Sequence, residues 1–136
     1  MPRAVASTRP LGAYIVAEST LVPGTVAAGA STRAHITFLP NAAIQAHWNN
    51  AVDDLVFWIE PPEGWEVDRR VLTVANPPQT VSLEPRKVEL EIRVPDNAAN
   101  GEVTLPGYAL YYVCEDVNGI CLYRRQDVAM TLRVHN

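Results

Sequence analysis

Residues 107–126 read GYALYYVCEDVNGICLYRRQ and contain both cysteines of the chain, Cys114 and Cys121. An apolar, aromatic run precedes the first cysteine, and a shorter one follows the second. The polar segment between them contains Asn118-Gly119, a pair that favours a tight turn between two strands. The stretch therefore predicts a β-hairpin with one cysteine on each arm near its tip. Residues that face each other on antiparallel strands have Cβ atoms about 4.5–5.5 Å apart, so the two sulfurs come within reach of a disulfide.

The rest of the chain shows the patterns of short strands. Apolar and polar residues alternate along Arg33–Leu39, Lys87–Val94 and Asp127–His135, which marks half-buried strands. No window carries a convincing helical period. The segment Ala42–Asp54 has room for a short helical turn, but its density of polar residues favours a loop. About eight to ten short strands, with turn signals roughly every 8–12 residues, predict an all-β, immunoglobulin-like antiparallel β-sandwich. The 11 prolines fit this fold because they fall at predicted strand ends and loops.

Length and charge limit the classes of function. The 136 residues fit a flexible leader at 1–12 and a single β-sandwich domain at 13–136. The net charge is −4, and the basic pairs Arg69-Arg70 and Arg124-Arg125 are too short for a nucleic-acid surface. No apolar run approaches the roughly 20 residues of a membrane-spanning helix. The first residues lack the apolar centre of a secretory signal, so we expect a cytosolic protein, a chain that begins after a removed leader, or a domain cut from a longer chain.

Two interpretations of the cysteine pair stay open. In the first, the bond is structural: closing a loop of about eight residues stabilises a protein by roughly 2.5 kcal/mol on the chain-entropy model. In the second, the pair is an exchanging dithiol/disulfide, because a hairpin tip leaves one sulfur open to an attacking thiolate. A zinc site is not expected, because two cysteines without a matching Cys or His pair fall short of four ligands. No other cofactor is expected.

Acidic and aromatic residues flank the cysteines. Glu115 and Asp116 follow Cys114 directly. They belong either to a solvated turn or to an acid–base site, because a carboxylate raises the pKa of a neighbouring thiol and its protonated form can give a proton to a leaving thiolate. Tyr112 and Tyr123 either pack against the core or form a wall that shields the sulfurs.

His47 and Trp48 form an unusual polar-aromatic pair within the predicted loop. One interpretation is a structural or merely exposed pair. The other is that the loop folds over the hairpin tip and acts as a lid on the disulfide.

Taken together, the strand-rich pattern, the segment 46–50, the turn at 62–65 and the late hairpin with Cys114 and Cys121 resemble a known family. They resemble the N-terminal domain of thiol:disulfide interchange proteins of the DsbD type. They are also similar to the C-terminal β domain of thioredoxin-like proteins with NHL repeats. The resemblance covers most of residues 13–136. Six residues separate the cysteines here, one more than that family leads us to expect.

The resemblance implies that Cys114 and Cys121 are a redox pair that relays electrons between thioredoxin-like partners. It thereby implies a thiol-disulfide interchange or protein-disulfide reductase activity in the periplasm or another extracytoplasmic compartment, within a larger membrane-anchored or multidomain protein. Neither nucleic acid nor direct membrane insertion is expected. The alternative is a non-catalytic β-sandwich interaction domain with a structural disulfide, located in the cytoplasm if it is not exported.

Overall fold

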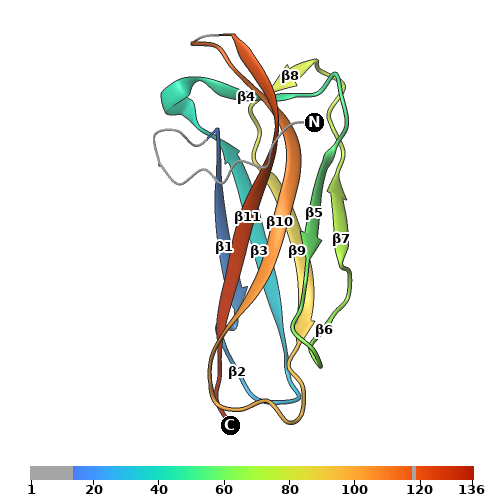
Figure 1. The fold of residues 1–136 in the computed structure, drawn as a ribbon, viewed down its shortest axis with the longest axis vertical. Coiled ribbons are helices and arrows are strands. Elements are labelled where there is room, and N and C mark those ends of the chain that lie inside the picture. The colour runs from blue at the N-terminus through green and yellow to red at the C-terminus, as the bar shows by residue number, and fades with distance from the viewer. Residues whose placement is uncertain (1–13, 118) are drawn as a thin grey trace.

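The computed structural model describes residues 14–117 and 119–136, which form two β-sheets packed face to face (Figure 1). The strands are β1 (Ile15–Val22), β2 (Thr25–Val26), β3 (Ser31–Pro40), β4 (Ala46–Asn49), β5 (Leu55–Ile59), β6 (Glu66–Val67), β7 (Val71–Val74), β8 (Val81–Ser82), β9 (Arg86–Arg93), β10 (Gly101–Glu115) and β11 (Ile120–Val134). One short 3-10 helix, η2 (Ala42–Ile44), lies between β3 and β4.

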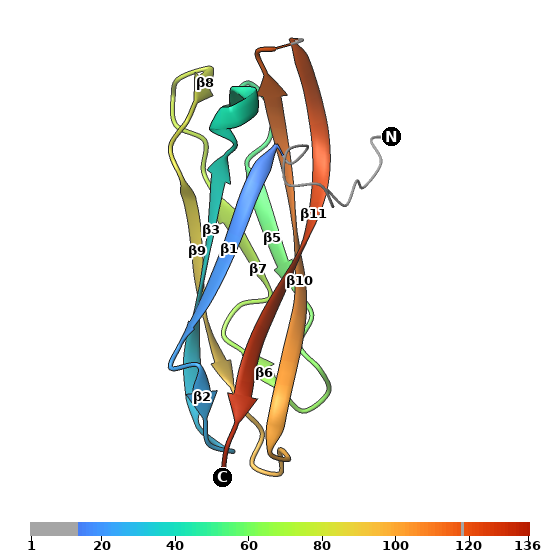
Figure 2. The same ribbon diagram turned by 90° about the vertical axis from the view of Figure 1, so that its left-hand side faces the viewer.

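The strand order is that of an immunoglobulin-like sandwich. One sheet has the order β1-β3-β9-β6, and the other has β2-β11-β10-β4-β8, with β5 also paired to β10 and β7 paired to β5. These orders correspond to the ABED and CFG sheets of that fold. Figure 2 shows β1, β3 and β9 on one side of the molecule and β10 and β11 on the other. The predicted fold class is therefore confirmed, although β2 pairs with β11 in parallel rather than antiparallel.

Alternating burial along the strands forms the core between the sheets. Every second residue of β3 and of β9 is buried, as expected for strands with one face on the core. Apolar side chains from both sheets form one cluster, and each large one contributes about 1.5–3 kcal/mol through burial. The largest fully buried side chains include Trp48, Phe38, Phe57, Ile36, Leu90 and Met130.

A long antiparallel hairpin of β10 and β11 dominates the second sheet. Its register runs from Gly101 opposite Val134 to Glu115 opposite Ile120. Figure 1 shows its tip at one end of the molecule, next to β4. β5 pairs with the middle of β10, and β4 pairs with β10 at the tip. The hairpin tip is therefore supported on one side by β4.

Gly107 lets β10 approach β5 closely. A Cβ at this position would lie 2.8 Å from both the ring of Phe57 and the carbonyl oxygen of Trp58. No real Cβ fits at that distance, so a side chain here would push the two strands apart.

The interpretation of Ala42–Asp54 as a loop is wrong in part. Residues 42–44 form η2, and residues 46–49 form β4, which pairs with β10. The reason is burial: Ala46 and Trp48 face the core, and the polar residues alternate with them. The predicted leader, residues 1–12, lies outside the described residues. Within the described part, no helix is long and apolar enough to cross a membrane.

Candidate functional site

Cys114 and Cys121 form a disulfide at the tip of the β10–β11 hairpin. They are paired directly across the two strands, and their Cα atoms lie 3.9 Å apart. The prediction that the hairpin brings the two sulfurs together is therefore confirmed. The turn between them includes Gly119 with a φ of 69°, a conformation that glycine adopts readily. Asn118, the other residue of the predicted turn pair, lies outside the described residues.

The two cysteines differ in exposure. Cys114 is only 7% exposed, whereas Cys121 is an exposed residue. Their neighbours at the tip include apolar side chains in solvent, because Val117 is 62% and Ile120 is 43% exposed. The disulfide thus has one buried end and one open end.

His47 lies beside the disulfide on the outer face of the sheet, the face turned away from the core. In the sheet, His47 of β4 is paired with Cys114 of β10, and Cys121 of β11 is paired with Cys114 from the other side. Directly paired residues project to the same face of a sheet, so the three side chains form one row across β4, β10 and β11. The next row, Val113 and Trp48, is fully buried on the opposite face.

Both nitrogens of the His47 ring have a polar partner. Nε2 lies 2.9 Å from Oδ1 of Asp116, and Nδ1 lies 3.3 Å from the carbonyl oxygen of Trp48. The His47 side chain is 13% exposed and that of Asp116 is 62% exposed. The backbone N–H of Asp116 also donates to the carbonyl oxygen of Gln45, 3.2 Å away. The hairpin tip is therefore joined by polar contacts both to β4 and to Gln45, the residue before it.

The two acidic residues after Cys114 have different surroundings. Asp116 reaches His47 on the outer face, whereas Glu115 is paired with Ala46 and is only 4% exposed. Oε1 of Glu115 accepts a hydrogen bond from the backbone N–H of Ile120 at 3.3 Å. Glu115 therefore closes the hairpin, and Asp116 is the carboxylate next to the histidine.

Tyr112 and Tyr123 form the next outer-face row beside the disulfide. They are paired across β10 and β11, and their ring centroids lie 4.6 Å apart. Partial burial, followed by the charges of Tyr112, Asp53 and Tyr108, raises the pKa of Tyr123. The two rings thus border the sulfurs on the same face as His47.

The aromatic surface continues further along the sheet. Trp58 stacks on Tyr108 with ring centroids 6.2 Å apart, and the guanidinium of Arg125 lies 4.0 Å from the centre of the Tyr108 ring. Arg125 also forms an ion pair with Asp127 at 3.2 Å. These side chains lead from the middle of the hairpin toward its tip.

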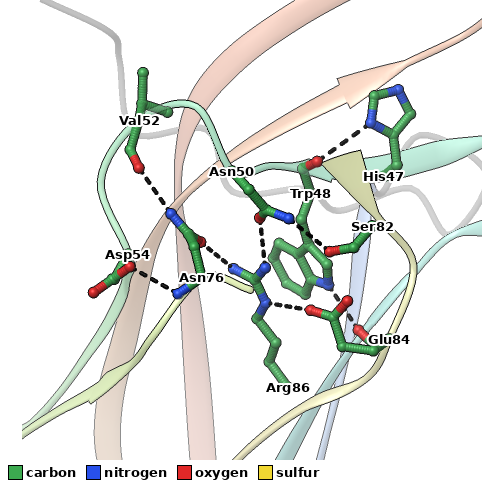
Figure 3. A network of polar contacts seen from close by, with 9 residues as sticks. All are labelled: His47, Trp48, Asn50, Val52, Asp54, Asn76, Ser82, Glu84 and Arg86. Carbon is green, nitrogen blue, oxygen red and sulfur yellow. Dashed lines mark hydrogen bonds and ion pairs between the residues drawn. The ribbon is translucent and has the colours of Figure 1, made fainter. Parts of the chain in front are cut away.

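Trp48 does not cover the disulfide, because its side chain lies in the core. Its indole N–H donates to the carbonyl oxygen of Glu84 at 2.7 Å, and the Arg86 guanidinium lies 4.4 Å from the centre of its ring (Figure 3). The lid interpretation therefore does not apply to Trp48, which instead anchors β4 from below.

Arg86 is a buried cation that the sequence did not single out. It is 3% exposed, and its guanidinium donates to Glu84 at 2.9 Å, to Asn76 at 2.9 Å and to Asn50 at 2.6 Å (Figure 3). Asn50 in turn donates to the hydroxyl of Ser82 at 2.8 Å. The alternation along the sequence could have indicated this burial, because Arg86 falls on the same face of β9 as the core residues that follow it. This network fixes β4 against β8 and β9.

A surface hollow of about 550 Å³ lies next to the histidine. His47 and Asp116 line one part of it, and Val81, Ser82 and Leu83 line the other. Val81 is 49% exposed and Leu83 is 66% exposed. The described residues contain no group of three or more His, Cys, Asp or Glu side chains arranged to hold a metal ion.

Comparisons with known proteins give no family. No family model matches the chain, and no curated protein matches it. Among solved structures, AvmM, which catalyzes macrocyclization in alchivemycin A biosynthesis, has a TM-score of 0.42 and 11% identity over 90% of this chain and 89% of its own. BslA, a bacterial hydrophobin, has a TM-score of 0.37 and 10% identity over 86% of this chain and 93% of its own. Such weak similarity carries no argument about function, and the resemblance to DsbD-type domains stays a prediction.

Proposed function

We propose that this domain is a thiol–disulfide exchange module that relays electrons between thioredoxin-like partners through Cys114 and Cys121. The observation that supports it best is the unequal exposure of the two bonded cysteines. Thiol–disulfide exchange requires an incoming thiolate to reach one sulfur in line with the bond. An exposed Cys121 at a hairpin tip gives a partner that access, and the buried Cys114 is then the leaving sulfur.

Each step of the exchange conserves atoms and electrons. A partner thiolate attacks the sulfur of Cys121, the disulfide breaks, and its electron pair goes to Cys114 as a thiolate. The second thiolate of the partner then attacks the partner sulfur in the mixed disulfide and releases Cys121 as a thiolate. The partner leaves as a disulfide, and this domain holds two reduced cysteines. The reverse sequence passes the electrons to an oxidised partner.

The surroundings of the disulfide support a protein partner. The exposed apolar side chains of Val81, Leu83, Val117 and Ile120 lie on β8, on the segment that follows it and at the hairpin tip. A partner that covers them removes apolar surface from water while its thiolate reaches Cys121. A persistent disulfide also favours an oxidising, extracytoplasmic compartment.

The test is to mix the oxidised protein with a reduced thioredoxin-like protein and to follow the thiols of both over time. We expect the partner to become oxidised while Cys114 and Cys121 become reduced. The matched control is the double variant Cys114→Ala/Cys121→Ala, which has the same surface but no disulfide to give. If the partner is oxidised no faster by the wild type than by this control, the proposed function is wrong.

A non-catalytic interaction domain is the second candidate, and the exposed apolar side chains around the tip favour it. Such a domain would bind its partner with the disulfide intact. Binding that occurs without any thiol transfer would support this candidate instead.

A further inference from the structure

His47 lies directly opposite Cys114, the buried cysteine of the disulfide. β10 has His47 on one side of Cys114 and Cys121 on the other. Directly opposed residues in antiparallel strands have Cβ atoms about 4.5–5.5 Å apart, so the side chains of His47 and Cys114 start from neighbouring positions on one face of the sheet.

Two acceptors hold the His47 ring in place. A neutral imidazole carries one N–H and can donate only one hydrogen bond. Here each ring nitrogen lies near an acceptor: a carboxylate oxygen of Asp116 at 2.9 Å and the carbonyl oxygen of Trp48 at 3.3 Å. Both contacts fix the orientation of the ring.

The charged and titratable groups around the His47 ring come from several elements. Asp116 is the nearest of them and is mostly exposed, whereas the His47 side chain is 13% exposed. From β10, Glu115 is paired with Ala46 in the row that faces the core. Beyond β8, Glu84 bonds to Arg86. In the next row, the titratable groups are the phenols of Tyr112 and Tyr123, with Asp53 close to the latter.

We propose that His47, held in place by Asp116 and the Trp48 carbonyl, stabilises the thiolate of Cys114 as an imidazolium when the disulfide opens. This inference rests on the proposed function. When a partner thiolate attacks Cys121, the electron pair of the broken bond goes to the Cys114 sulfur. Cys114 is 7% exposed, so water solvates that negative charge poorly. A neighbouring imidazolium supplies the stabilisation that water does not, and Asp116 acts as a positioning residue.

The direct test measures thiolate formation by Cys114 in the Cys121→Ser variant, from ultraviolet absorbance against pH. Adding His47→Gln removes the cation. We expect the pH midpoint of thiolate formation to rise by about one unit, which is the lower end of the shift that an adjacent opposite charge causes. His47→Arg keeps a cation and is expected to keep the midpoint low. His35→Gln is the matched control, because His35 lies on β3 in the other sheet beside Glu89. An unchanged midpoint in a folded His47→Gln variant would overturn the inference, as would an equal shift in the His35→Gln control.

A second measurement uses the wild type alone, so it does not depend on whether a variant folds. Mutual stabilisation is reciprocal, so the Cys114 thiolate must also favour the imidazolium of His47. We expect the His47 ring signals in nuclear magnetic resonance spectra to shift at a higher pH in the reduced wild type than in the oxidised one. Identical titration curves in the two redox states would refute the stabilisation.

A kinetic measurement with a small dithiol separates this inference from the proposed function. We expect dithiothreitol to reduce the disulfide about threefold more slowly in His47→Gln than in the wild type near neutral pH, because exchange rates follow thiol acidity with a fractional slope. Equal rates would contradict the inference. If His47→Gln slows this reaction but the wild type does not exchange with a thioredoxin-like protein, the proposed function fails while the role of His47 stands.

Discussion

Cys114 and Cys121 face each other across β10 and β11 with Cα atoms 3.9 Å apart, yet Cys114 is buried and Cys121 is exposed. Two features cause this difference. Cys114 belongs to a central strand with neighbours on both sides, whereas in the sheet Cys121 is paired only with Cys114 among the described strands. In a disulfide between a buried and an exposed cysteine, we expect a partner thiolate to approach from the side of the exposed one.

The first prediction concerns which cysteine a partner attacks. In Cys114→Ala the exposed Cys121 remains, and in Cys121→Ala the buried Cys114 remains. Because access limits exchange, we expect the free thiol of Cys114→Ala to attack the disulfide of an oxidised thioredoxin-like protein, and so to form a mixed disulfide, at least about tenfold faster than that of Cys121→Ala. Mass spectrometry of alkylated samples measures both rates. If Cys121→Ala forms the mixed disulfide faster, Cys114 is the more accessible cysteine in solution, and the prediction is wrong.

The second prediction concerns stability without the bond. The chain-entropy model gives at most about 2.5 kcal/mol for so short a loop, and the paired strands of the hairpin already hold its ends together. We expect Cys114→Ala/Cys121→Ala to keep the β-sandwich and to lose about 1–2 kcal/mol of unfolding free energy in urea. Loss of the fold on removing the cysteines would instead assign the disulfide a structural role.

The third prediction concerns the buried guanidinium of Arg86. Replacing it by alanine leaves Glu84, Asn76 and Asn50 without their donor and removes the contact with Trp48. We expect Arg86→Ala to lower the unfolding free energy by about 3–5 kcal/mol, as when one partner of a buried ionic network is removed.

The control for Arg86 is Arg33→Ala. Arg33 forms ion pairs with Glu89 and Glu91 in solvent, and its side chain is 45% exposed. Exposed pairs of this kind contribute about 0–1 kcal/mol, so the control is expected to change stability little. Similar losses in the two variants would show that burial of Arg86 is not what matters.

The fourth prediction concerns alkaline pH and Tyr111. Burial raises the pKa of the Tyr111 phenol, and the charge of Arg124 opposes this rise only in part. The hydroxyl donates to Oε1 of Gln126 at 2.6 Å. Because the folded pKa is raised, this stabilisation is complete below the ordinary tyrosine pKa of about 10 and is lost as pH rises above it. Urea unfolding at several pH values should show that Tyr111→Phe costs about 1 kcal/mol at neutral pH and has a weaker dependence on alkaline pH. An unchanged alkaline dependence in Tyr111→Phe would rule Tyr111 out as its source.

The sequence predicted those parts of the fold that local patterns specify. Alternation identified β3 and β9, and the Asn-Gly pair between two cysteines identified the hairpin. It did not identify β4, because His47, Asn49 and Asn50 masked the alternation of Ala46 and Trp48 with polar density. The pairing of that segment with β10 and with β8, both distant in sequence, makes it a strand.

The site was predicted in part for the same reason. Its cysteines follow each other closely along the chain, so their pairing could be predicted locally. The contact of His47 with Asp116 joins positions 69 residues apart, and nothing in the sequence specifies it. β10 runs through Pro106 and Gly107, and the Pro106 carbonyl accepts the N–H of Glu60 at 2.9 Å.

The reduction potential of the Cys114–Cys121 disulfide tests the proposed exchange most directly. It is measured by equilibrating the protein with glutathione buffers of known ratio and counting thiols. We expect a potential above about −300 mV, in the range of exchanging disulfides. A potential below about −300 mV would identify a bond that biological thiols do not reduce, and would contradict the proposed function.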